Sequence, residues 1–339
     1  MSEKLNIFIP SYNRHLKCFK LVKTLIIQKK NIKNVIINVL DNCSDTIYED
    51  YFKEQAITEK EIKKGTLKIF RNKVNIGMSA NITRCFEASS SLEGWLWIIS
   101  DDDLLDNSAI KKVLDSISDS NINSGFIKFS SKTFLHENKF IIDNPKDLIS
   151  HIKENPRVRF NSYIFLTNMI YKINNFKDAV NIAYDHGISH VPHLFILILS
   201  LSSKNYILHC NKKIVDYVKP DIGYSYGLFA GLQIGAIQAI NIPNISLRDF
   251  HNIFQVHNDY KIAIDLYFEL KSKNSLNNYS TLLFIHLLNL FFSKCYLRCI
   301  GFSMFTLLIL NPFIRKIVIY TLLKTSVKNH ILEMKLRYK

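Results

Sequence analysis

The chain has 339 residues, 47% of them hydrophobic and 22% charged, and 44 lysines and arginines against 29 aspartates and glutamates give a formal net charge of +15. This composition excludes an intrinsically disordered chain, and the length allows one large domain or two ordinary ones. The basic excess favours a polyanionic partner: nucleic acid, anionic lipid headgroups or a phosphorylated substrate. The six cysteines form no CxxC pair and no secretory signal opens the chain, so we expect a cytoplasmic protein with free thiols.

Strands and helices are predicted to alternate over the first hundred residues. Apolar, β-branched runs predict strands and amphipathic patterns predict helices. In chain order these are strand 5–9, helix 15–29, strand 35–40, a charged helical stretch that leads to strand 66–70, helix 78–89 and strand 95–99. The last strand holds two tryptophans and is apolar throughout, which is typical of a strand buried on both faces. This order of elements predicts a three-layer α/β sheet.

Polar side chains follow each predicted strand, where open α/β sheets bind their ligands. After the last strand come Asp101, Asp102 and Asp103, three carboxylates that repel one another and are costly to hold together without a cation. We therefore expect a divalent-metal site that faces an anionic substrate. The alternative is a solvated acidic turn.

The residues that follow the other strands fit a nucleotide ligand. The ring of Tyr12 could stack on a base, Asp41 could accept hydrogen bonds from the base or ribose, and a cation on the aspartates could bridge a diphosphate. Arg71 and Asn75 follow the third strand. Each residue also has a simpler interpretation: Tyr12 packs on the sheet, Asp41 caps a turn, and residues 75–77 form an ordinary loop.

Four motifs, residues 9–14, 40–45, 75–81 and 99–103, together resemble the family 2 glycosyltransferases of the GT-A fold. The resemblance implies a nucleotide-sugar donor, a Mg²⁺ or Mn²⁺ ion, and transfer with inversion at the anomeric carbon. The donor-binding residues that it implies are Pro10, Tyr12, Arg14, Asp41, Arg71, Asn75, Gly77, Asn81, Asp101 and Asp102. It places the metal at Asp102 and Asp103, although Ser100 stands where the family often has an acid, so the choice among the three aspartates stays open.

Inversion requires a base that deprotonates the acceptor hydroxyl, and the family mostly uses a carboxylate from the second half of the domain. A histidine-rich loop precedes a predicted apolar helix at 194–201. Asp185 is the first candidate for the base, followed by His190 and His193. The alternatives are that Asp185 is a turn residue and that His193 packs at the start of the helix. Further strands are expected at 125–129, within 158–171, at 206–210 and at 213–217.

We predict a GT-A catalytic domain at 1–220, with a donor half at about 1–105 and an acceptor half at about 106–220, followed by a helical C-terminal region at 221–339.

The C-terminal region contains apolar blocks at 282–292, 300–310 and 314–323, separated by basic residues. Each block is shorter than the roughly 20 residues that cross a bilayer. The pattern favours association with the inner face of the cytoplasmic membrane. The alternatives are a buried helical core or an oligomer interface, and, more weakly, a spanning helix pair.

These expectations combine into an inverting glycosyltransferase that moves a hexose or deoxyhexose to a lipid-linked or growing oligosaccharide acceptor. The resemblance extends to transferases of O-antigen and capsule assembly, including abequosyltransferase-like enzymes. We expect no nucleic-acid partner, because a nucleic-acid binder would not need three aspartates at a strand end. The alternative function is a non-catalytic basic binding or scaffold protein of polysaccharide assembly.

Overall fold

The computed structural model describes residues 3–119, 124–130, 139–154, 162–185, 191–216, 300, 301 and 303. Contacts divide the chain into one unit of Met1–Gly187 and Val191–Lys219 and a second of Ile188–His190 and Pro220–Lys339. Nearly all of the second unit lies outside the described residues, so the predicted helical C-terminal region and its apolar blocks stay predictions. In the described part of the chain, no helix combines the length and apolar character needed to cross a membrane.

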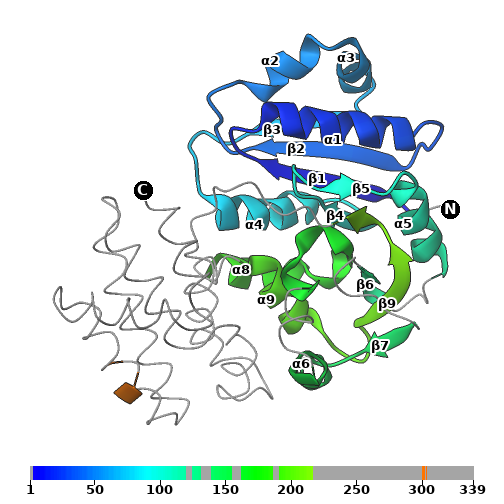
Figure 1. The fold of residues 1–339 in the computed structure, drawn as a ribbon, viewed down its shortest axis with the longest axis vertical. Helices are drawn as coiled ribbons and strands as arrows, with labels where there is room; N and C mark the ends of the chain where they lie inside the picture. The colour runs from blue at the N-terminus through cyan, green and yellow to red at the C-terminus, as the bar shows by residue number, and fades with distance from the viewer. Residues whose placement is uncertain are drawn as a thin grey trace, which may run out of the picture. The chain divides into compact units, whose positions relative to one another are not determined.

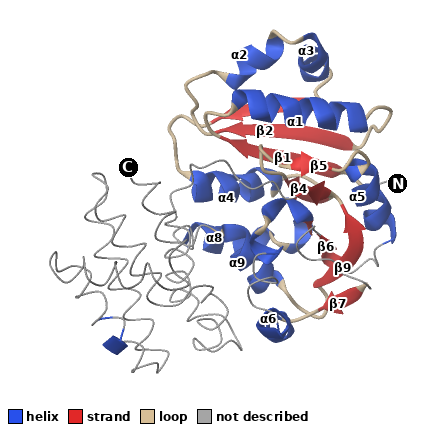
Figure 2. Cartoon of the chain, viewed as in Figure 1, coloured by secondary structure: helices blue, strands red, loops and turns tan. Residues whose placement is uncertain are grey.

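The first unit is built on an eight-stranded sheet in the order β3-β2-β1-β4-β8-β6-β9-β7 (Figures 1 and 2). The strands are β1 Leu5–Ser11, β2 Val35–Asp41, β3 Leu67–Arg71, β4 Trp95–Ile98, β6 Ser124–Ser130, β7 Phe140–Ile142, β8 Met169–Lys172 and β9 Tyr206–Lys213. Strands β1 to β4 are parallel, and β8 is antiparallel to both β4 and β6. The carboxyl ends of β1 to β4, the start of β8 and the end of β6 therefore share one edge of the sheet.

Helices cover both faces of this sheet (Figure 1). They are α1 His15–Gln28, α2 Tyr48–Lys53, α3 Ala56–Lys63, α4 Met78–Ser89, α5 Ala109–Asp119, α6 Pro145–Glu154, α8 Val180–Asp185 and α9 Pro192–Ser200, with 3₁₀ turns η1 Leu166–Asn168, η2 Ile173–Asn175 and η3 Lys177–Ala179. Helix α1 packs on β1 and α5, whereas α4 packs on β1, β4, α8 and α9. The result is the three-layer α/β arrangement that the sequence predicts.

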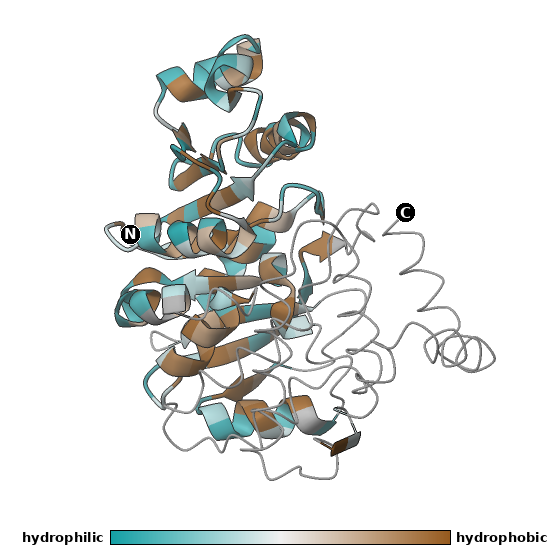
Figure 3. Ribbon diagram, turned by 90° about the vertical axis from the view of Figure 1, so that its left-hand side faces the viewer, coloured by the Kyte–Doolittle hydropathy of each residue, from teal (hydrophilic) through white to brown (hydrophobic). Residues whose placement is uncertain are grey.

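The core follows from the alternation of side chains along the strands. Leu5, Ile7 and Ile9 of β1 join the residues of α1 and α5 in one apolar cluster, together with Trp95 and Trp97 of β4. The intervening residues of β4 are buried as well, so this strand is buried on both faces, as predicted. Figure 3 shows apolar residues along the strands of the sheet.

An aromatic cluster packs on the face of the sheet opposite to α1 and α5. The ring of Tyr171 on β8 lies 5.0 Å from Phe86 of α4 and 5.8 Å from Phe126 of β6, in edge-to-face geometry. Phe86 also lies 5.2 Å from Phe176. These contacts join the donor and acceptor halves of the sheet, because β8 is the strand between β4 and β6.

The last predicted strand forms a small sheet of its own. Residues 213–217 were expected to form a closing strand of the domain, and β10 Val215–Asp216 pairs antiparallel with β5 Leu104–Leu105 in a separate two-stranded sheet. The pairing brings the end of the described first unit against the chain that directly follows the three aspartates. The strand expected within 158–171 is β8, which begins only at Met169 and extends to Lys172.

Candidate active site

Three strand ends align in one row at the shared edge. In the parallel register, Ser11 of β1 lies opposite Asp41 of β2, and Asp41 lies opposite Arg71 of β3. Asp41 is 1% exposed; it forms an ion pair with Arg71 and accepts a hydrogen bond of 2.9 Å from the Ser44 backbone N–H. Strand register therefore brings the predicted residues Asp41 and Arg71 together.

Asn42 organises the loop that contains Asn75 and Gly77. Its Nδ2 group donates to Asn75 Oδ1 at 2.7 Å and to the Gly77 carbonyl at 3.3 Å. Gly77 has φ +84°, the left-handed region that favours glycine, and directly precedes α4. Asn81, in the first turns of α4, is 3% exposed and accepts a hydrogen bond of 3.0 Å from Asn72. These predicted residues thus shape the loop at the edge of the sheet.

The loop after β1 carries Pro10, Tyr12 and Arg14. Pro10 is paired with Leu40 inside the sheet, and the Tyr12 side chain is exposed. The Arg14 backbone N–H donates to the Tyr48 hydroxyl at 2.8 Å, and that hydroxyl lies 2.8 Å from Ser11 Oγ. Since Ser11 donates its hydrogen to Asp101 at 2.5 Å, Tyr48 is the donor to Ser11.

The three aspartates have different partners. Nη1 of Arg14 lies 3.0 Å from Asp101 Oδ1 and 2.9 Å from Asp102 Oδ2, so one guanidinium forms ion pairs with two carboxylates. Asp103 instead accepts a hydrogen bond from the Thr167 hydroxyl. Thr167 Oγ1 in turn accepts one of 3.0 Å from the Ser100 backbone N–H.

The protonation behaviour of these carboxylates follows from their surroundings. Burial raises the pKa of Asp101, against the opposing effects of its hydrogen bond from Ser11 and the charge of Arg14. Burial also raises the pKa of Asp103 to about 7; the negative charges of Asp102 and Asp101 add to this, and the Thr167 hydrogen bond opposes it. Within the part of the chain that the structure describes, Asp103 forms no ion pair.

The aspartates fit a divalent cation that is shared with a substrate. No group of three or more histidine, cysteine or acidic residues suited to hold a metal occurs among the described residues. Mg²⁺, however, is usually bound by one or two carboxylates and completes its shell with water and substrate phosphates. Asp103 supplies a half-buried carboxylate that has no counter-ion among the described residues, which is the donor chemistry that such a cation requires.

Of the three candidate bases, the structure describes the side chain of one. Asp185 is the last residue of α8, but its side chain, like all of His190, lies outside the described residues. His193, on α9, is 3% exposed and its Nε2–H donates to the Ile164 carbonyl at 3.2 Å. Burial lowers the pKa of His193 to about 4.

Several residues that form the site were not predicted from the sequence. Ser11, Asn42 and Ser44 lie inside the quoted motifs, and their positions at strand ends could have indicated a role. Thr167 carried no such signal, because it is 64 residues from Asp103 and only the antiparallel pairing of β8 with β4 brings it there.

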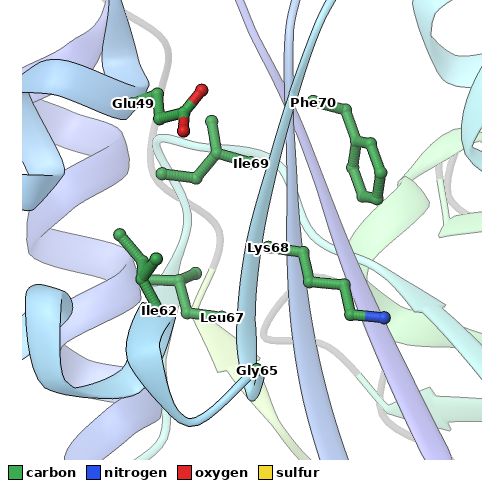
Figure 4. A pocket seen from close by; sticks show the side chains of 7 residues that line it. All are labelled: Glu49, Ile62, Gly65, Leu67, Lys68, Ile69 and Phe70. Atoms are coloured by element: carbon green, nitrogen blue, oxygen red, sulfur yellow. The ribbon is translucent and has the colours of Figure 1, made fainter.

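A separate pocket of about 290 Å³ lies between β3, α2 and α3, with Glu49, Ile62 and Leu67 in its lining (Figure 4). In Figure 4 the side chains of Leu67 and Ile69 point to the helices, and those of Lys68 and Phe70 point to the other face of the strand. None of the predicted donor-binding residues lines it.

The fold and this edge define the class of protein: a transferase of the GT-A fold, with a parallel donor half joined through an antiparallel strand to a second half. The chain belongs to the family described as Glycosyl transferase family 2, whose model matches residues 6–187. The protein is therefore a glycosyltransferase. No curated protein matches the sequence.

Solved structures show the same fold at low identity. The structure of TarS 1-349 from S. aureus in complex with UDP-GlcNAc has a TM-score of 0.56 and 15% identity, over 88% of this chain and 89% of that one. A second structure of TarS 1-349, with no ligand named, has a TM-score of 0.53 and 14% identity, over 84% of this chain and 80% of that one. The mannosyltransferase PcManGT from Pyrobaculum calidifontis in complex with GDP-Man and Mn²⁺ has a TM-score of 0.51 and 11% identity, over 100% of this chain and 87% of that one. At these identities the likeness shows the fold alone, and the fold class predicted from the sequence is confirmed.

Proposed function

We propose that this glycosyltransferase moves a sugar, with inversion, from a nucleoside-diphosphate sugar to a hydroxyl group of a lipid-linked or growing oligosaccharide, and that it uses Mg²⁺ or Mn²⁺. The observation that carries the proposal is the edge where β1 to β4 end, since it joins the Asp41–Arg71 pair to three aspartates, of which Asp103 has no ion pair with any described residue. The ligands of the similar solved structures, UDP-GlcNAc in one and GDP-Man with Mn²⁺ in the other, support the donor class and the metal.

Each group at the edge has a role in holding the donor. The exposed ring of Tyr12 is available to stack on the base, and Asp41, which forms an ion pair with Arg71, would accept hydrogen bonds from base or ribose. Arg14 keeps Asp101 and Asp102 in place. Asp102 and Asp103 would hold the cation, which when bound supplies positive charge for the diphosphate that leaves.

The transfer needs one proton acceptor from the chain. The carboxylate of Asp185 would take the proton from the acceptor hydroxyl as its oxygen forms a bond to the anomeric carbon. The bond from that carbon to the diphosphate oxygen breaks, and the nucleoside diphosphate leaves with the electron pair. His190 and His193 are the alternative bases, and the pKa of about 4 makes His193 a weaker base than an ordinary histidine.

Charge and sequence pattern support the proposed acceptor and location. The net charge of +15 and the apolar blocks between basic residues support attachment to anionic lipid. We place the enzyme in the cytoplasm, peripheral on the inner membrane face, where a lipid-linked saccharide is within reach. Assembly of O-antigen or capsule, with a hexosyl or abequosyl-like deoxyhexosyl transfer, is the role that we propose.

The test is a transfer assay with the full chain. Radiolabelled UDP-, GDP-, CDP- and dTDP-sugars are incubated with bacterial lipid extract and Mn²⁺, and both nucleoside diphosphate release and label in the lipid phase are measured. The proposal expects one donor class to be consumed and its sugar to enter the lipid phase. If folded protein consumes none of them, the non-catalytic scaffold becomes the better account.

A further inference from the structure

Lys128 is a fully buried lysine on β6, the strand next to β8. Its Nζ donates to the Ser162 carbonyl at 2.7 Å and to the side-chain oxygen of Asn168. Burial lowers the pKa of Lys128 well below its ordinary value. The amine has at least two N–H groups, enough to donate to both of these acceptors.

The two acceptors of Lys128 stand at either end of a segment that reaches the three aspartates. Between them lies Thr167, whose carbonyl accepts a hydrogen bond of 2.7 Å from the Trp97 indole N–H. The Thr167 hydroxyl accepts from the Ser100 backbone N–H at 3.0 Å and donates to Asp103. Residues 162–168 are therefore hydrogen-bonded to Lys128 on one side and to β4 and the turn that holds the aspartates on the other.

We propose that Lys128 is a positioning residue for Asp103: it fixes residues 162–168 so that the Thr167 hydroxyl holds the Asp103 carboxylate in the orientation that binds the cation and the donor. Lys128 itself, fully buried, acts through Asn168 and Thr167. The inference rests on the proposed function and deepens it, since it names a residue that sets metal affinity at that site.

A lysine suits this task because a buried backbone carbonyl and a buried amide oxygen both need a donor. Lys128→Met would keep most of the side-chain volume but leave both acceptors unpaired. Loss of a hydrogen bond behind a metal ligand typically weakens metal binding by about 10-fold to 100-fold.

The chain offers a matched control. Lys29 is also buried, at the C-terminal end of α1, and its Nζ lies 2.5 Å from Glu61. Lys29→Met also removes a buried amine and is expected to lower the melting temperature, but Lys29 contacts neither residues 162–168 nor the aspartates in the described structure. A change seen in Lys128→Met and absent in Lys29→Met is therefore specific to the site.

The experiment measures the apparent Kd for Mn²⁺ from the electron paramagnetic resonance signal of the free ion. The nucleotide present is whichever of UDP, GDP, CDP and dTDP stabilises the full-length wild type. We expect Lys128→Met to raise this Kd about 10-fold and Lys29→Met to change it less than about 2-fold. Thr167→Val should raise the Kd as much as Lys128→Met does. The variant with both substitutions should bind Mn²⁺ no more weakly than the single variant with the higher Kd, because both substitutions act on one contact.

Equal Mn²⁺ affinities in Lys128→Met and Lys29→Met, or additive losses in the double variant, would overturn the positioning role. If Lys128→Met does not fold, Asn168→Leu removes the same link and is expected to give the same loss, and an unchanged Kd there would equally reject the inference. Wild type without metal-dependent nucleotide binding would instead reject the proposed function, and the inference with it.

Discussion

The guanidinium of Arg14 lies within 3.0 Å of carboxylate oxygens on both Asp101 and Asp102, which follow it by 87 and 88 residues. This contact joins the loop after β1 to the turn after β4. Among the residues that the structure describes, Asp101 and Asp102 thus form an ion pair with this guanidinium, whereas Asp103 has no cationic partner.

The Arg14 contact predicts that Arg14→Met weakens both folding and donor binding. Without the guanidinium, Asp101 and Asp102 repel each other in a partly buried site, so we expect a loss of about 1–3 kcal/mol in the free energy of unfolding. Urea denaturation measures this loss. Lys111→Met, which removes an exposed lysine paired with Asp115, is the control and should change the free energy by less than about 0.5 kcal/mol. Equal effects of the two variants would show that Arg14 makes no special contribution.

Asp41→Asn is expected to raise the KM for the donor about 10-fold with little change in kcat. The substitution keeps the shape of the side chain but removes the charge that pairs with Arg71, so binding is weakened equally in the ground state and the transition state. Initial-rate kinetics with the preferred donor measure both constants. Asp45→Asn, at an exposed position in the same loop, serves as the control. A fall in kcat at unchanged KM would argue against donor binding by Asp41.

His193 makes stability depend on pH between about 6.5 and 4. Its pKa is about 4 in the folded protein and about 6.5 in the unfolded chain. The unfolded state therefore binds more protons in this range, and stability is complete above pH 6.5 and falls as the pH drops towards 4, by about 3 kcal/mol in total. Denaturation at several pH values measures the slope, and His193→Gln should reduce it. An unchanged slope in the variant would mean that His193 is not buried in neutral form.

Glu61 adds a second pH effect at lower pH. Burial raises the pKa of Glu61, but hydrogen bonds from Lys29, Thr66 and Lys64 outweigh it and lower the pKa to about 2. Because the folded pKa lies below the unfolded value of about 4.3, this stability is present above pH 4.3 and is lost as the pH falls to 2. Glu61→Gln should flatten acid denaturation in that range, and a slope identical to that of wild type would contradict the assignment.

Much of the donor half could be predicted because its signals are local. The apolar run 95–99 and the amphipathic pattern at 78–89 each define an element within a few residues. Parallel strands then place Asp41 and Arg71 at one edge without further information. The observed helix α4 has the predicted bounds, and β1 is two residues longer than predicted, since Pro10 and Ser11 pair with β2.

The second half was harder to predict because its contacts join distant segments. Lysine is rarely buried without a charged partner, so nothing local indicated that Lys128 points inward to Ser162 and Asn168. The partner strand of β10 likewise could not be identified, because a two-residue ladder to Leu104–Leu105 depends on where the main sheet ends. The location of the base stays a prediction for the same reason.

The most direct test of the account is nucleotide binding with and without metal, measured by thermal shift on wild type and on Asp103→Asn. A ligand that binds only the folded state must raise the melting temperature. The account predicts that one of UDP, GDP, CDP or dTDP stabilises wild type only when Mn²⁺ or Mg²⁺ is present, and that Asp103→Asn, although folded, loses this shift. Stabilisation that is the same without metal, or the same in Asp103→Asn, would contradict the metal-dependent site.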